Sequence, residues 1–179
     1  QGMSADRADV LLICYGNPGR LDAGLGAAFA EALQGMAPDG VEVDVDYQLT
    51  VEHAAAVAEH RYAIFVDASV EDKEPFFFRR LELGEEVTFS THSVKPEAVL
   101  AMASEFFGAE PEGYALGIRG YEFNEFGEFL SPGATKNMTA ALQFMLPMLE
   151  KRNFSEMAAE QGETAADLNG EMKCKTEST

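Results

Sequence analysis

The stretch Val10–Gly26, VLLICYGNPGRLDAGLG, constrains the fold more than any other part of the chain. It begins with an apolar run of strand length, Val10–Tyr15, turns at residues 16–19, and continues from Asp22 into a helix rich in Ala and Leu. A buried strand, a Gly-rich turn and a helix form the entry to a β-α-β unit, which requires a parallel sheet covered by helices. Ligands of such folds bind outside the carboxyl ends of the strands, so this turn is expected to form one wall of any site.

The rest of the chain continues the alternation of strands and helices. Strands are predicted at Val41–Tyr47, Tyr62–Val66, Phe76–Leu81, Glu86–Ser90 and Tyr114–Arg119, and helices at about 22–36, 51–61, 96–107 and 135–149. Valines alternate with acidic residues over 41–47, which indicates a half-exposed strand near a sheet edge. The two strands on either side of Gly84 suggest an antiparallel pair that departs from the parallel pattern. The pattern predicts an α/β fold, a three-layer sandwich with a mostly parallel central sheet and helices on both faces.

The length of 179 residues suits one domain, which we expect to span 10–153. Gln1 and Gly2 precede Met3, so residues 1–9 are interpreted as a tag remnant and leader. Residues 154–179 lack a sustained apolar pattern and are predicted to be an acidic, partly disordered tail that begins as a frayed helix from 155. There is no signal-like segment, no apolar run near 18 residues and only two cysteines. These features predict a cytoplasmic protein without membrane insertion.

The formal net charge is −18, from 31 acidic and 13 basic residues. Affinity for nucleic acid comes largely from Lys and Arg beside phosphates, so this charge has the wrong sign for a nucleic-acid partner. Anionic membranes are disfavoured for the same reason. The acidity fits simple solubility, and it also fits attraction to a basic protein partner or a metal ion.

Three side chains are candidates for a shared site. Asp67 ends the strand Tyr62–Val66, and Asp22 follows the first strand, so a doubly wound sheet can bring these carboxylates together. His92 follows the predicted strand at 86–90. Two carboxylates and one imidazole suit a borderline divalent ion such as Zn²⁺ or Ni²⁺.

Each candidate also has a simpler interpretation. Asp22 and Asp67 are residue types that cap helices and loops, and His92 is compatible with an ordinary loop histidine. His53 and His60 share a helix face but are interpreted as surface residues. A phosphate loop is disfavoured because no Lys follows the glycines, and Asp22 would repel the phosphate. No G-x-S-x-G motif occurs, and Cys14 lies mid-strand, so a Ser or Cys nucleophile lacks support.

Five short motifs occur in a fixed order along the chain. They are Gly16-Asn17-Pro18-Gly19-Arg20 with Asp22, Gly24 and Gly26; Gln48-Leu49-Thr50 with Glu52; Phe65-Val66-Asp67-Ala68; His92 with Pro96; and Gly127-Glu128 with Leu130-Ser131-Pro132. In this order they resemble the nickel–iron (NiFe) hydrogenase maturation endopeptidases. The resemblance runs from about Val10 to Leu149 and covers nearly the whole predicted domain.

The resemblance implies a cytoplasmic protease that removes the C-terminal extension of a NiFe-hydrogenase large-subunit precursor after nickel loading. The nickel belongs to the substrate, so no permanent cofactor is implied, and Zn or Cd can take the place of nickel. The family's metal-binding trio is an acidic residue after the first strand, an Asp ending a later strand, and a His. Asp67 and His92 match two of these. The third is the second residue of an acidic pair, where this chain has Ala23 after Asp22.

The departure at Ala23 leaves three possibilities. Asp22 rotates into the role of third ligand, Glu52 supplies the carboxylate, or the chain is a catalytically impaired homologue that acts as a metal- and partner-binding maturation scaffold. In an active enzyme, the metal would polarise the scissile carbonyl or activate a water, with Asp22 or Glu52 as general base.

Arg20 is expected to orient a substrate carboxylate or to stabilise the oxyanion, and Asn17 is a further substrate-binding candidate. A remote alternative is peptidyl-tRNA hydrolase, which also opens with a strand and a G-N-P-G turn. That family needs a downstream His–Asn pair and a basic face for tRNA, and the net charge of −18 disagrees with such a face.

Overall fold

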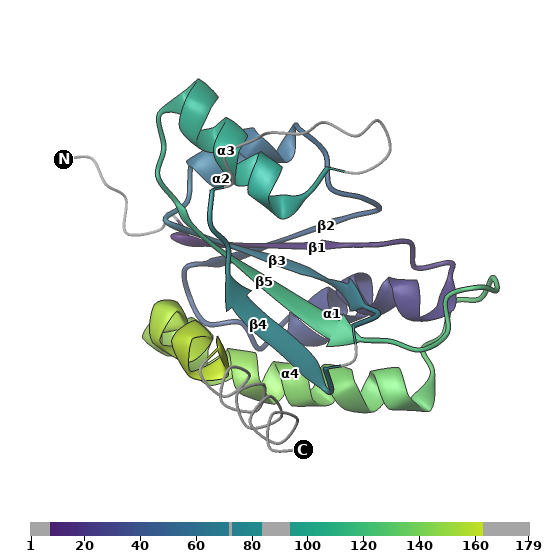
Figure 1. The fold of residues 1–179 in the computed structure, drawn as a ribbon. Coiled ribbons are helices and arrows are strands. Elements are labelled where there is room, and N and C mark those ends of the chain that lie inside the picture. Colours follow the sequence, from purple (N-terminus) through teal and green to yellow (C-terminus); the bar gives the residue numbers. More distant parts are fainter. Residues whose placement is uncertain (1–7, 72, 84–93, 163–179) are drawn as a thin grey trace, which may run out of the picture.

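The computed structural model describes residues 8–71, 73–83 and 94–162, which form a sheet with helices on both faces (Figure 1). The elements in chain order are β1 (Val10–Tyr15), the 3₁₀ helix η1 (Leu21–Gly24), α1 (Leu25–Leu33), β2 (Val41–Asp46), α2 (His53–Ala58), β3 (Tyr62–Ser69), β4 (Phe76–Arg80), α3 (Pro96–Phe107), β5 (Glu112–Arg119) and α4 (Pro132–Lys151). The predicted α/β three-layer sandwich is confirmed.

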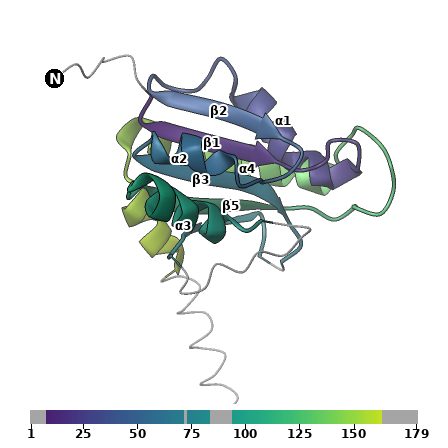
Figure 2. The same ribbon diagram turned by 90° about the horizontal axis from the view of Figure 1, so that it is seen from above.

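The strand order is β2-β1-β3-β5-β4, and β2, β1, β3 and β5 run parallel (Figure 2). The acidic alternating strand β2 is an edge strand, as its pattern predicted. β4 forms the other edge and pairs antiparallel with β5, from Phe76↔Ile118 to Arg80↔Tyr114. The strand predicted at Glu86–Ser90 lies outside the described residues.

Alternation along the buried strands divides the core into two layers. Leu12 and Cys14 of β1 belong to the layer that contains α1 and α4, whereas Leu11 and Ile13 belong to the layer that contains α2 and α3. Figure 1 shows these two pairs of helices on opposite faces of the sheet. All four side chains are buried, which explains why the strand appears in the sequence as a continuous apolar run.

The helix after the first strand begins later than its sequence predicted. Residues 21–24 form η1, and α1 starts at Leu25. Gly26 lies directly against the sheet, because an added methyl group there would be 2.5 Å from the Tyr15 carbonyl oxygen and 3.1 Å from that of Val66. Only glycine allows the first turn of α1 to approach β1 and β3 this closely.

Helix α3 matches its predicted range, and Gly108 directly after it has a φ of 66°, which gives the left-handed cap expected of glycine. The sequence predicts an apolar stripe of Val99, Leu100, Ala103, Phe106 and Phe107 on this helix, and Val99 and Ala103 are buried as predicted. The apolar stripe, however, also included Phe106 and Phe107, which are 69% and 57% exposed. Helical periodicity identifies the side of a helix that faces the sheet, but it does not reveal where along the helix the contact with the sheet stops.

The core continues beyond the predicted boundary at residue 153. Residues 154–162 are helical, and Phe154 is fully buried, with ring centroids 4.9 Å from Tyr62 and 5.6 Å from Tyr114. The described part of the segment assigned to the tail, 154–162, is the helix that the sequence interpretation placed before the disordered residues, and its packing against the sheet was not predicted because one buried aromatic and Ala158 are too sparse to produce a periodic signal. Within the described ranges, no helix has the length and apolarity needed to cross a bilayer.

Candidate active site

The carboxyl ends of β1 and β3 form the topological switch point of the sheet, since the chain leaves β1 for β2 on one side and returns to β3 on the other. Cys14 pairs with Val66, so Asp67 lies one step further, beside the turn. A methyl group added at Gly16 would be 3.4 Å from Asp67 Oδ1 and 2.3 Å from the Ala23 carbonyl oxygen. The turn, Asp67 and the backbone of Ala23 therefore converge, which confirms that the two strand ends are neighbours.

Asp67 faces a cavity of about 270 Å³ whose lining includes Phe77, Arg79 and Pro96. Burial raises the pKa of Asp67 to about 6, although the backbone N–H of Ala68 donates to Oδ1 at 2.8 Å and opposes this shift. A carboxyl group that ionises near neutral pH is suited both to metal binding and to proton transfer.

Tyr15 and Arg79 belong to the same cavity and were not anticipated from the sequence. Burial, followed by the negative charges of Asp67 and Glu97, raises the pKa of the Tyr15 hydroxyl, whereas Arg79 lowers it. Tyr15 therefore presents a protonated hydroxyl beside a carboxylate. The available signal was its position as the only residue with a polar tip in the apolar run Val10–Tyr15.

Asp22 is directed away from this cavity. Its Oδ1 accepts from the backbone N–H of Ser131 at 2.7 Å, and its Oδ2 accepts from Ser131 Oγ at 2.7 Å, Tyr121 N at 2.8 Å and Glu122 N at 3.0 Å. Burial raises the pKa of Asp22, but these hydrogen bonds outweigh burial and hold the pKa below its ordinary value.

The simpler interpretation of Asp22 as a helix cap does not hold, because Asp22 lies within η1, Gly24 precedes α1, and the Asp22 carboxylate binds the loop after β5. Its side chain is completely buried, and both carboxylate oxygens are engaged. Rotation toward Asp67 would break all four hydrogen bonds, so the geometry argues against Asp22 as the third metal ligand or general base.

The other proposed site residues lie around the turn. Asn17 Oδ1 accepts from the backbone N–H of Gly19 at 2.9 Å and shapes the turn. Arg20 is exposed, with its guanidinium carbon 4.9 Å from the centroid of the Phe126 ring. Glu52 is exposed at the residue before α2, and no described residue engages its carboxylate.

His53 and His60 are not surface residues, contrary to their predicted role. Both side chains are only 6% exposed. His53 Nδ1 accepts from the backbone N–H of Thr50 at 3.0 Å, and Nε2 lies 3.4 Å from Asp46 Oδ2. His60 Nε2 lies 2.6 Å from Glu42 Oε2. Both histidines fasten α2 to the acidic face of β2, which the alternating pattern had assigned to solvent.

His92 lies outside the described residues. Pro96, four positions later in the sequence, lines the cavity that contains Asp67. Over residues 8–71, 73–83 and 94–162, no three side chains from His, Cys, Asp and Glu are arranged to hold a metal ion. Among the side chains that the sequence suggested as metal ligands, Asp67 is the one that the described residues place at the switch point.

Large exposed apolar side chains occur in the segments that follow the carboxyl ends of the parallel strands. Those in the segments at or after the strand ends are Val45, Tyr47, Val51, Val70, Tyr121, Phe126 and Phe129. Seven of the eleven large exposed apolar side chains of the described residues lie in these segments, and exposed apolar groups of this kind are typical of a surface that binds another macromolecule. This edge is therefore better suited to a protein substrate than to a small molecule.

The fold and the site define an α/β protein with a half-buried carboxylate at its switch point, and the same fold occurs in hydrogenase maturation proteases. Hydrogenase maturating endopeptidase HybD from E. coli superposes with a TM-score of 0.63 at 24% identity, over 80% of this chain and 93% of that protein. HycI from Thermococcus kodakarensis superposes with a TM-score of 0.61 at 18% identity, over 82% of this chain and 95% of that protein. Hydrogenase 2 maturation peptidase from a Thaumarchaeota archaeon superposes with a TM-score of 0.59 at 23% identity, over 79% of this chain and 97% of that protein.

No sequence profile of a protein family and no curated protein sequence matches the chain. The likeness is therefore one of structure, and it extends over almost the full length of each protein named above. The chain has the fold of the hydrogenase maturation endopeptidases, as its sequence resemblance implied.

Proposed function

We propose that this chain is a protease that removes the C-terminal extension of a nickel-loaded NiFe-hydrogenase large-subunit precursor. The observation that carries the proposal is Asp67, a half-buried carboxylate at the switch point of this fold. The exposed apolar edge supports a protein substrate. We place the reaction in the cytoplasm, as the sequence resemblance implies.

In this proposal the nickel arrives with the substrate, and Asp67 and His92 recognise it. Such an ion polarises the scissile carbonyl or lowers the pKa of a bound water. Water adds to the carbonyl carbon, the C–N bond breaks, and the proton lost by the water passes to the leaving amine. Asp67 and Glu52 are the carboxylates proposed to accept that proton, while Asn17 and Arg20 contact the substrate.

A processing assay on a nickel-loaded precursor tests this function. Asp67→Asn and His92→Ala should each slow cleavage by roughly 100-fold or more, because each removes one recognition group. Asp39→Asn, an exposed carboxylate after α1, is the matched control and should cleave at the wild-type rate. Unchanged processing by both site variants would refute the assignment of the site.

Ala23 favours a second candidate, a maturation scaffold that binds the precursor without cleaving it. Its backbone lies against the Gly16 turn beside Asp67, but its methyl side chain offers no metal ligand. Ala23→Asp discriminates between the two functions. A large gain of cleavage with unchanged precursor binding would identify the natural chain as the scaffold, whereas efficient cleavage by the wild type would exclude that role.

A further inference from the structure

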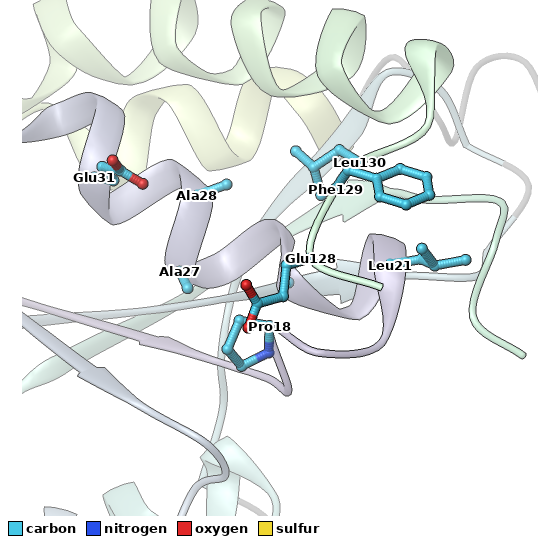
Figure 3. A pocket seen from close by; sticks show the side chains of 9 residues that line it. Pro18, Leu21, Ala27, Ala28, Glu31, Glu128, Phe129 and Leu130 are labelled. Atoms are coloured by element: carbon cyan, nitrogen blue, oxygen red, sulfur yellow. The ribbon is translucent and has the colours of Figure 1, made fainter. Parts of the chain in front are cut away.

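A second cavity, of about 310 Å³, lies between α1 and the segment 128–130 (Figure 3). It includes Pro18, which belongs to the same turn whose Gly16 faces Asp67. Its walls are apolar at Leu21, Ala27, Ala28, Phe129 and Leu130. The cavity therefore borders the candidate active site but is built from different residues.

Two carboxylates, Glu31 and Glu128, complete the lining, and no basic residue of the described chain contributes to it. Figure 3 shows both glutamates among the side chains that line the cavity, with Glu31 one turn beyond Ala27 along α1. Both glutamates are exposed, and neither is a partner in the ion pairs of the described ranges. The nearby cation Arg20 is stacked on the Phe126 ring. The cavity thus combines apolar walls with uncompensated negative charge.

The walls are held in place before any ligand arrives. Leu21 N donates to the Gly127 carbonyl oxygen at 2.9 Å, and Gly127 N donates to that of Gly19 at 2.8 Å. The four hydrogen bonds to Asp22 secure the same loop. Phe129 is nevertheless 67% exposed on this fixed backbone. A preorganised surface binds a partner without the cost of ordering the loop.

Lysine and arginine combine an aliphatic stem with a cationic tip, so they match apolar walls that lead to carboxylates. An anionic group would be repelled, and a purely apolar side chain would desolvate the glutamates without compensation. We propose that this cavity binds a lysine or arginine side chain of the protein partner and so positions the partner beside the Asp67 site. The identity of that partner as the hydrogenase precursor rests on the proposed function.

The first experiment measures the affinity of the nickel-loaded precursor for the chain by titration calorimetry. Glu128→Lys and Glu31→Lys should each weaken binding by about tenfold, and the salt dependence of binding should decrease. Glu59→Lys, an exposed glutamate at the end of α2, makes the same charge change elsewhere and should stay within about twofold of wild type. If all three variants bind equally well, the cavity does not contact the partner and the inference is wrong.

The second experiment does not depend on the precursor. Nα-acetyl-lysine amide and Nα-acetyl-norleucine amide share their aliphatic stem, and only the first carries a charge. The lysine probe should shift the NMR signals of the Ala27 and Ala28 methyl groups and bind at least about threefold more tightly than norleucine. Glu128→Lys should remove that preference.

Equal binding of the two probes, or no shift at these methyl groups, would overturn the assignment of the cavity. A wild-type chain that prefers the lysine probe but does not bind the precursor would support the cavity and contradict the proposed function instead. The two experiments thus separate failure of the cavity assignment from failure of the proposed reaction.

Discussion

Burial of the Asp67 carboxyl group lowers the free energy of unfolding by an amount that depends on pH. Its pKa rises from 3.8 to about 6 on folding because burial disfavours the carboxylate. Between these values the folded state binds more protons than the unfolded state, so the free energy of unfolding falls as the pH rises through this window. Above pH 6 the full cost is present, and the difference between the two pKa values corresponds to roughly 3 kcal/mol at most.

Asp67→Asn should therefore stabilise the protein at pH 7.5 by up to roughly 3 kcal/mol and leave it unchanged near pH 3.5. The amide oxygen can still accept from Ala68 N, so the backbone bond is retained. Urea unfolding at both pH values measures the difference, with Asp39→Asn as the exposed control. A variant that is less stable than wild type at pH 7.5 would contradict the burial cost.

Asp22 has the opposite effect on stability. Asp22→Ala should destabilise the protein by about 3 kcal/mol or more, because the backbone N–H groups of Tyr121, Glu122 and Ser131 lose their acceptor. Since the folded pKa of Asp22 is lowered, its contribution is present above the unfolded pKa and is lost as the pH falls through the folded pKa. Urea unfolding gives the magnitude.

Amide hydrogen exchange locates the effect of that substitution, which should appear first as lost protection at residues 121, 122 and 131. Asp39→Ala, which removes an exposed carboxylate, should alter neither unfolding nor exchange at these amides. Full protection of the three amides in Asp22→Ala would show that the loop does not depend on this side chain.

The residue-scale predictions succeeded where chemistry followed local position. The position of Asp67 at the switch point was predicted because Asp67 directly follows the apolar run Tyr62–Val66, and parallel strands place their carboxyl ends at one edge. The role of Asp22 could not be found in this way, because its partners lie about 100 residues away in the chain. The buried roles of His53 and His60 likewise depend on α2 packing beside β2, which no local pattern reports.

At the scale of elements, apolar runs and turn residues predicted the buried strands well, whereas packing determined several helix limits. Helix α4 was predicted at about 135–149 but runs from Pro132 to Lys151. It continues through an interior proline, Pro147. Proline lacks the N–H that would donate to the carbonyl of residue 143 and crowds the preceding turn.

Pro147→Ala should raise the free energy of unfolding by about 1 kcal/mol, since alanine restores that donor and Pro147 is exposed. Pro132→Ala is the matched control, because proline at the first turn of a helix removes no intrahelical bond and should change stability little. Thermal unfolding compares the two. Equal melting temperatures for all three proteins would indicate that α4 is already relaxed around Pro147.

At the scale of the whole molecule, alternation of strands and helices predicted the layers and the parallel sheet. The C-terminal limit of the domain could not be predicted, because only a few side chains of the segment after α4 pack against the sheet. Phe154 is the chief contact, packed against Tyr62 of β3 and Tyr114 of β5. The C-terminal helical segment therefore covers the amino-terminal half of two central strands.

Phe154→Ala should lower the free energy of unfolding by about 3–5 kcal/mol, because it removes a fully buried ring from a packed core. Phe106→Ala removes the same ring from an exposed position and should change stability by less than about 0.5 kcal/mol. Urea unfolding of both variants gives the comparison. If Phe154→Ala is as stable as Phe106→Ala, the domain ends at residue 153 and the last helix is an appendage; a large difference makes residues 154–162 part of the domain that presents Asp67.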